Sequence, residues 1–208
     1  MKTVIFHVDA NSAFLSWSAV YRLRVLGEKQ DLREIPAVVG GQKESRHGIV
    51  LARSQPAKKL GIKTGEPVFM ALQKCPDLVI EPPNYELYVE ASRHFVEVLR
   101  RFSPNVEQYS IDEAWVDMTG TERLWGSPLL AAEKMRQRIW EELGFTVNVG
   151  ISSNKLLAKM AGDFEKPNKV HTLFPEEVEG KMWPLPVRDL FLVGAATEKK
   201  LNLMGIYT

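Results

Sequence analysis

Apolar residues occur along the chain both in short runs and at helical spacing, and their order predicts strands that alternate with helices. The apolar runs predict strands at 4–8, 36–39, 48–52 and 145–151, and a hairpin within 106–118. Apolar residues three and four positions apart predict helices at 14–25, 84–102, 128–143 and 155–163. Strands interleaved with helices of this length indicate a layered α/β or α+β fold.

Turn and cap residues set the bounds of these helices. Gly27 and Gly144 follow the last apolar residue of two helical stripes, where glycine commonly ends a helix. Ser127-Pro128 is a strong helix start, because serine caps the free amides and proline suits the first helical position. Ser103-Pro104 ends the helix that Asn84 opens. The strands predicted at 36–39 and 48–52 indicate a separate small subdomain after the first strand.

Composition places the chain among ordinary globular proteins. It has 208 residues, of which 45% are hydrophobic and 25% charged, enough for a sizeable core. The single cysteine, Cys75, excludes an intramolecular disulfide, and no apolar run approaches the roughly 18 residues of a spanning helix. We expect a reducing, cytoplasmic location and no membrane partner.

The net charge of +1 is low for a nucleic-acid-binding protein, but the charge is unevenly distributed. Between Lys43 and Lys63 six basic residues face one acid, Glu44, whereas three acids cluster in 176–179. A solvated surface is the ordinary explanation of such a run. A local basic surface for phosphates is the alternative.

Three carboxylates carry the strongest chemical signal. Asp9 closes the first apolar run, and Asp112-Glu113 lies inside the predicted hairpin. An ionised carboxylate at a buried strand needs a cationic partner, and Mg²⁺ prefers one or two carboxylates together with water and substrate phosphates. Neighbouring residues of a flat strand point to opposite faces, so Asp112 and Glu113 share one site only near a hairpin tip. The pattern indicates phosphoryl transfer at two metal ions.

Three motifs then resemble one family. The segments 8–14 (VDANSAF), 110–114 (SIDEA) and 149–168, with GISSNKLLAK followed by EKPN, resemble those of the Y-family translesion DNA polymerases, bacterial branch, in order and approximate spacing. The resemblance covers essentially the whole chain. It implies that Asp9, Asp112 and Glu113 are catalytic metal ligands and that the Ala10 carbonyl adds a backbone oxygen.

The resemblance also implies a nucleotide site. Phe14 matches the position under the incoming sugar, where a ring leaves no room for a 2′-hydroxyl. Lys166 matches the lysine that contacts the triphosphate, and Lys58, with Arg53, falls in the phosphate-binding segment of the fingers. Gln55 departs from the tyrosine of many relatives.

The end of the chain resembles the first half of a helix-hairpin-helix, in which Gly194 would help backbone amides to bind a DNA phosphate. The implied domains are palm (1–12 and 81–174), fingers (13–80) and the start of a thumb (175–208). The family's last, DNA-gripping little-finger domain is absent. We therefore expect a truncated catalytic fragment with weak activity.

The resulting prediction is an α+β fold, with a mixed or antiparallel palm sheet packed on helices, small fingers and a partial helical thumb. The implied function is translesion DNA synthesis in damage tolerance with two Mg²⁺ ions, which Mn²⁺ could replace. The implied partners are primer-template DNA, deoxynucleoside triphosphates and, through the missing C-terminal region, a sliding clamp, at the nucleoid. A nucleotidyl cyclase-like palm enzyme and an inactive polymerase-like accessory protein are the alternatives.

Overall fold

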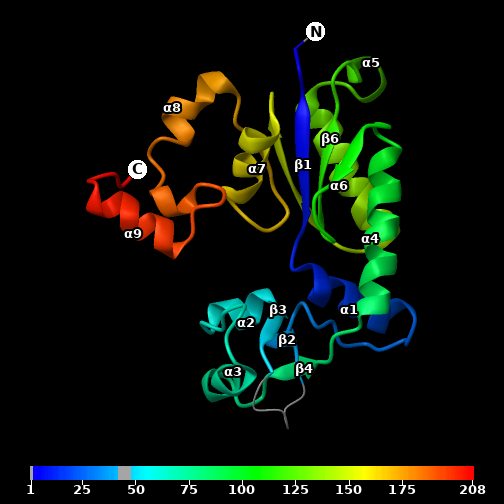
Figure 1. Cartoon of the computed structure of the whole chain (residues 1–208). Coiled ribbons are helices and arrows are strands. Elements are labelled where there is room, and N and C mark those ends of the chain that lie inside the picture. Colours follow the sequence, from blue (N-terminus) through cyan, green and yellow to red (C-terminus); the bar gives the residue numbers. More distant parts are fainter. Residues whose placement is uncertain (1, 42–47) are drawn as a thin grey trace. The chain divides into compact units, whose positions relative to one another are not determined.

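The computed structural model describes residues 2–41 and 48–208, which form two compact units. One unit contains Met1–Asp9, Val96–Ile139 and Thr146–Thr208, and the other contains Ala10–Phe95 and Trp140–Phe145. The elements in chain order are β1 (Ile5–Ala10), α1 (Ala13–Arg24), β2 (Ala37–Gly40), β3 (Val50–Arg53), α2 (Gln55–Lys59), α3 (Val68–Lys74), β4 (Val79–Glu81), α4 (Tyr85–Arg100), β5 (Val106–Gln108), β6 (Glu113–Asp117), α5 (Glu122–Trp125), α6 (Pro128–Leu143), β7 (Val147–Ser152), α7 (Lys155–Asp163), β8 (Val170–Thr172), α8 (Val178–Lys181) and α9 (Ala195–Leu203) (Figure 1).

The first unit is built on a five-stranded sheet in the order β5-β6-β1-β7-β8. β6 pairs antiparallel with both β1 and β5, whereas β7 and β8 are parallel. Figure 1 shows α6 beside this sheet, and α7 packs on β7. A mixed sheet packed on helices confirms the predicted α+β class.

The central strands of this sheet have one apolar and one polar face, because side chains alternate along a strand. Phe6, Val8, Ala114 and Val116 are completely buried and supply the apolar face. The same alternation places His7 and Asp9 on the other face. The buried apolar side chains therefore fix the strands in place, and the polar residues lie on the opposite face of the sheet.

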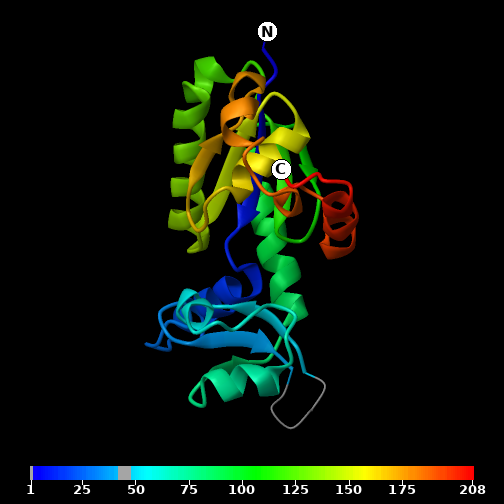
Figure 2. The same ribbon diagram turned by 90° about the vertical axis from the view of Figure 1, so that its left-hand side faces the viewer.

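The second unit contains a three-stranded sheet in the order β3-β2-β4, in which β2 pairs antiparallel with β3 and parallel with β4. Val38, Val50, Ala57 and Ala71 join the strands to α2 and α3 in one apolar cluster. Figure 2 shows α3 lying along this sheet.

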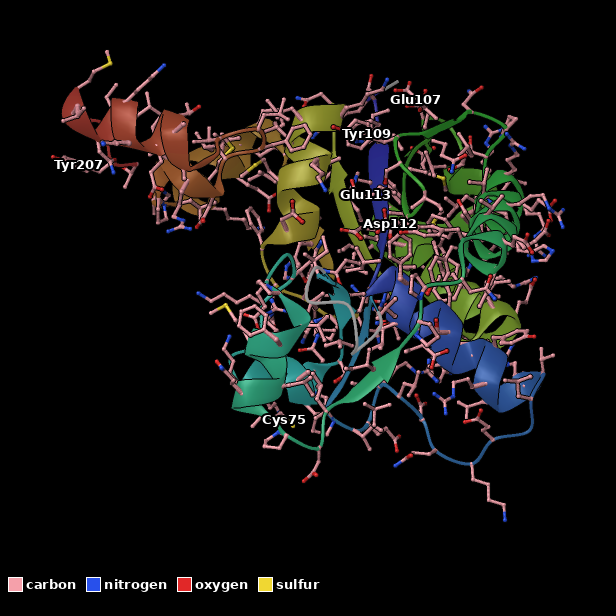
Figure 3. The ribbon with its side chains drawn as sticks, turned by 60° about the horizontal axis from the view of Figure 1, so that its bottom comes forward. Cys75, Glu107, Tyr109, Asp112, Glu113 and Tyr207 are labelled. Atoms are coloured by element: carbon pink, nitrogen blue, oxygen red, sulfur yellow. The ribbon has the colours of Figure 1, made fainter. Side chains whose placement is uncertain are left out.

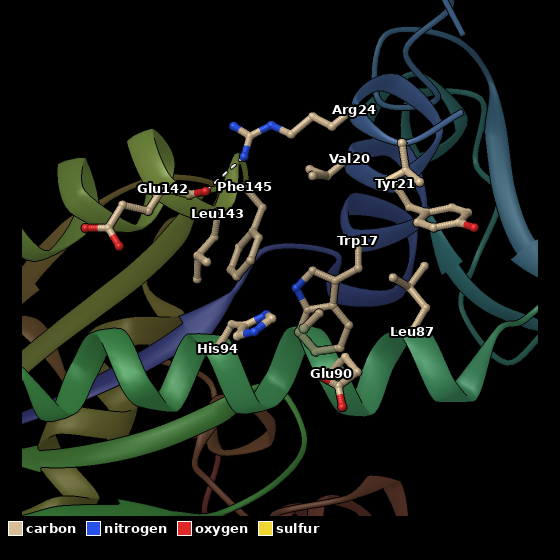
Figure 4. A pocket seen from close by; sticks show the side chains of 12 residues that line it. Trp17, Val20, Tyr21, Arg24, Leu87, Glu90, His94, Glu142, Leu143 and Phe145 are labelled. Atoms are coloured by element: carbon tan, nitrogen blue, oxygen red, sulfur yellow. Dashed lines mark hydrogen bonds between the residues drawn. The ribbon is translucent and has the colours of Figure 1, made fainter. Parts of the chain in front are cut away.

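A mostly apolar cavity of about 270 Å³ lies in the second unit between α1, α4 and the end of α6 (Figure 4). The buried Trp17 lines it, and the Trp17 Nε1 donor has no hydrogen-bond partner among the described residues. Arg24 closes one side by donating to the Glu142 carbonyl oxygen at 2.9 Å. None of the residues expected to bind nucleotide or metal lines this cavity.

The predicted helices and strands are confirmed, with shifts of at most two residues at their ends. The first strand continues past its apolar run, so Asp9 lies inside β1 rather than after it. Lys43, Glu44 and Arg46 of the basic segment lie outside the described residues. Within the described part of the chain, every helix is too short or too polar to cross a bilayer.

Candidate active site

The polar face of β1 and β6 gathers two of the three expected carboxylates. Asp9 of β1 is the direct cross-strand partner of Glu113 on β6, and His7 is the partner of Trp115. Directly opposed residues of an antiparallel pair have Cβ atoms about 4.5 to 5.5 Å apart and share a face. The two carboxylates therefore lie on one side of the sheet, next to each other.

Asp112 lies in the bend just before β6, one residue ahead of Glu113 (Figure 3). The Ser110 hydroxyl donates to Asp112 Oδ1 at 2.8 Å and fixes the carboxylate in this bend. Because Asp112 is outside the regular strand, the alternation of a flat strand does not force it to the opposite face. The prediction that the acidic doublet lies near the hairpin tip is thus confirmed.

Two lysines supply the positive charge that the buried Asp9 and the partly buried Glu113 need. Lys166 Nζ donates to Asp9 Oδ2 and lies 2.8 Å from Asp163 Oδ1. Lys159 Nζ donates to Glu113 Oε2 at 2.9 Å, and the Lys159 side chain is only 8% exposed. Buried charges are stabilised only when they are paired in this way.

A polar strand residue orients the loop that carries Lys166. Asn148 of β7 donates from its amide nitrogen to the carbonyl oxygens of Gly162, at 3.1 Å, and Glu165, at 2.6 Å. These bonds hold the end of α7 and the loop after it. Lys166 therefore projects from a fixed backbone toward Asp9.

The surroundings move the pKa values of these groups in different directions. Burial raises the pKa of the Asp9 carboxyl above its ordinary value, an effect that the charge of Lys166 opposes and that of Glu113 reinforces. Burial also acts on Glu113, but hydrogen bonds from His7 and Lys159 outweigh it and lower the pKa of Glu113 to about 2. Burial opposes the charge on Lys166, yet Asp9 and Asp163 together raise the pKa of Lys166.

The donor set suits a hard divalent cation. Among the described residues no three His, Cys, Asp or Glu side chains are close enough to form a metal site by themselves. Asp9 and Glu113 nevertheless offer neighbouring carboxylate oxygens, and Mg²⁺ is typically bound by one or two carboxylates with water and substrate phosphates completing the shell. The residues fit a magnesium site that is completed by substrate.

The residues expected to bind nucleotide lie in the second unit, apart from Lys166. The ring of Phe14 stacks on Tyr88 with centroids 4.5 Å apart, and the Tyr88 hydroxyl lies 3.0 Å from Ser18 Oγ. Arg53 donates to the Ile62 carbonyl oxygen, whereas Lys58 is exposed in the last turn of α2. Gly194, in the first unit, is the N-cap of α9.

The model of the impB/mucB/samB family matches residues 8–163, and that of the IMS family HHH motif matches residues 175–206. The chain belongs to the impB/mucB/samB family.

Relatives in sequence and structure agree with this assignment. DNA polymerase IV of Clostridium acetobutylicum is 52% identical over 208 residues, which are 100% of this chain and 52% of that protein. A Y-family DNA polymerase chimera of Dbh and Dpo4 superimposes with a TM-score of 0.85 at 28% identity, covering 99% of this chain and 58% of the other. The insertion ternary complex of Dbh DNA polymerase gives 0.84 at 28% identity, with the same coverage. The resemblance to Y-family polymerases is confirmed, and the chain spans about half the length of the curated relatives it matches.

Two residues of the site in this impB/mucB/samB chain were not predicted from sequence. His7 lies within the apolar run that predicts β1, and Lys159 lies within a matching motif, but neither residue was assigned a role. Both contact Glu113 Oε2. The signal available in the sequence was a histidine and a lysine flanked by apolar residues.

Proposed function

We propose that this chain carries the catalytic centre of a translesion DNA polymerase, which transfers a deoxynucleotide to a primer 3′-end opposite damaged template. The 3′-hydroxyl oxygen forms a bond to the α-phosphorus, the bond from that phosphorus to the bridging oxygen breaks, and pyrophosphate leaves. The observation that carries the proposal is the cross-strand pair Asp9 and Glu113, with Lys166 on Asp9, in a member of this family.

The three acids and a backbone oxygen would hold the cations. Asp9, Asp112 and Glu113, with the Ala10 carbonyl, would bind two Mg²⁺ ions, which activate the attacking hydroxyl and stabilise the leaving oxygen. Mn²⁺ has similar oxygen preferences and would substitute for Mg²⁺. All three carboxylates would supply oxygens to these ions, Asp9 and Glu113 from the paired strands and Asp112 from the bend before β6.

The basic residues would bind and orient the triphosphate. Lys166 would exchange its contact with Asp9 for a phosphate oxygen when nucleotide binds, which frees the Asp9 oxygen for a cation. Lys58 and Arg53 of the fingers would neutralise further phosphate charge. Phe14, held by its stack on Tyr88, would exclude the ribose 2′-hydroxyl.

The partners would be primer-template DNA and deoxynucleoside triphosphates in the nucleoid, with a sliding clamp bound by the complete gene product. The backbone amides that follow Gly194 at the start of α9 would bind a DNA phosphate, as the match to the helix-hairpin-helix motif supports. That match also favours a template-directed polymerase over a nucleotidyl cyclase. Retention of all three acids favours an enzyme over an inactive accessory protein.

Primer extension by the complete gene product tests the proposal. Asp112→Ala should lower kcat/KM at least about 1,000-fold, because loss of a metal ligand removes charge stabilisation from the transition state. Glu107→Gln is the matched control, since Glu107 lies in the same hairpin, is exposed and, in the part of the chain that the structure describes, forms its ion pair with Lys155 at the surface. Equal rates for wild type and Asp112→Ala would exclude the proposed site.

A further inference from the structure

His7 lies in the middle of the candidate site although nothing in the polymerase chemistry requires it. Its side chain is completely buried, and its Nε2 lies 3.1 Å from Glu113 Oε2. Lys159 Nζ donates to the same oxygen at 2.9 Å. Two donors from different elements, β1 and α7, therefore converge on a single oxygen of Glu113.

The other oxygen of Glu113 is left open. Within the described part of the chain, Glu113 Oε1 accepts no hydrogen bond, so the two oxygens of one carboxylate have different surroundings. A carboxylate with one oxygen fully engaged can offer only the other to a cation. The geometry thus selects one-oxygen binding by Glu113 over binding through both oxygens.

The imidazole is held rigidly in the position that makes this contact. The ring lies 5.7 Å from that of Trp115, its cross-strand partner on β6. On the side of α7, a Cβ on Gly162 would come within 3.2 Å of His7 Nδ1. A side chain at this point of α7 would therefore press on the ring, which would have to move by a few tenths of an ångström.

The approach of α7 to the sheet depends on a second glycine. A Cβ on Gly150 of β7 would lie 2.0 Å from the Ala158 carbonyl oxygen and 2.3 Å from the Gly162 nitrogen. Such contacts are impossible, so Gly150 and Gly162 together allow α7 to lie close enough for Lys159 to reach Glu113. The same close packing encloses His7.

His7 Nδ1 is buried and has no hydrogen-bond partner among the described residues. An unpartnered buried polar atom lowers stability, so a core position would be better filled by an apolar side chain. Among the described residues, the only polar contact of His7 is with Glu113. The histidine is therefore explained by what it does to that carboxylate.

We propose that His7 is a positioning residue, which donates from Nε2 to Glu113 Oε2 and, with Lys159, fixes Glu113 so that Oε1 alone faces the cation. The inference rests on the proposed function, because it assumes that Glu113 is a metal ligand. Hydrogen bonds to the outer oxygen of a ligand typically change metal affinity 10- to 100-fold. No step of the reaction passes through the imidazole.

Cation binding provides the test, with a readout that does not depend on turnover. The complete gene product is bound to a dideoxy-terminated primer-template and deoxynucleotide, and Mn²⁺ affinity is measured by electron paramagnetic resonance. His7→Leu should weaken Mn²⁺ binding about 10-fold and raise the half-saturating Mg²⁺ concentration of primer extension similarly. The KM for nucleotide at saturating Mg²⁺ should change less than about twofold. His7→Gln should restore cation affinity, because the glutamine amide can donate from nearly the position of Nε2.

A His7→Leu protein with the wild-type melting temperature and wild-type Mn²⁺ affinity would overturn the inference. Should His7→Leu fail to fold, ¹⁵N NMR of the wild-type imidazole decides. The expected state has the proton on Nε2 and none on Nδ1, and the opposite tautomer would overturn the inference. Unaltered primer extension by Asp112→Ala would exclude the proposed function itself. If only the His7 assignment fails, Asp112→Ala still loses primer extension.

Discussion

At the scale of single residues, the surroundings of Phe14 fit both a place in an aromatic cluster and the proposed sugar gate. Its ring is part of an aromatic cluster, with Tyr88 stacked at 4.5 Å and Trp17 at 6.1 Å, yet Phe14 remains partly exposed. A ring that is fixed on one side and open on the other suits a steric gate.

Phe14→Ala should raise ribonucleotide insertion relative to deoxyribonucleotide at least about 10-fold, since a 2′-hydroxyl is then no longer excluded. Single-nucleotide insertion kinetics measure the ratio, and an unchanged ratio would reject the gate. Tyr85→Ala, in the same cluster, is the control for general loosening.

Glu113 gives a residue-scale prediction about stability. Its pKa falls from the ordinary 4.5 to about 2 on folding, so the ionised form favours the folded state. This contribution is fully present above about pH 4.5 and is lost as the pH falls through about 2, with a ceiling of the order of 3 kcal/mol. Glu113→Gln should therefore lose less stability than wild type between pH 5 and 3. Urea unfolding at both pH values measures the difference, with Glu107→Gln as the exposed control. Parallel losses in wild type and Glu113→Gln would contradict the assignment.

At the scale of elements, local signals decide what could be predicted. Ser127-Pro128 marks the start of α6, which begins where this pair indicates. The Asn154 side chain caps α7 by accepting from the Leu157 amide. β4 and β8 have three residues each, too few to show a period, and their pairing with β2 and β7 comes from distant parts of the chain. Short strands of this kind are fixed by tertiary contacts rather than by their own sequence.

The residues of the candidate site likewise differ in whether a local sequence signal points to them or only tertiary contacts do. Asp9, Asp112 and Glu113 could be singled out from the sequence because an ionised acid at or near an apolar strand needs a cationic partner. His7 and Lys159 could not, because their role depends on how closely α7 approaches β1 and β6. That approach is set by Gly150 and Gly162, whose importance appears only when the positions of neighbouring backbone atoms are known.

At the scale of the whole chain, the near-zero net charge comes from nearly equal numbers of basic and acidic residues, and many of these charges are paired within the chain. Many basic side chains contact acids of the same chain, among them Arg22, Arg33, Lys74, Lys155, Lys159, Lys166 and Lys181. Paired cations release few counterions on binding DNA, because their charge is already neutralised. With 27 basic and 26 acidic residues, the 208-residue chain has little surplus charge for phosphates.

We therefore expect this chain to bind primer-template DNA weakly, with a shallow dependence on salt. About two or three neutralised phosphates would give a slope of log K against log salt near −2 to −3. Fluorescence anisotropy between 50 and 200 mM salt measures it. A double substitution of the exposed Lys58 and Lys59 by glutamine should flatten the slope by up to about 2, whereas Lys155→Gln, whose charge is already paired with Glu107, should change it less. Nanomolar binding at 150 mM salt, or a slope steeper than about −6, would show that cations now paired inside the chain exchange their partners for DNA.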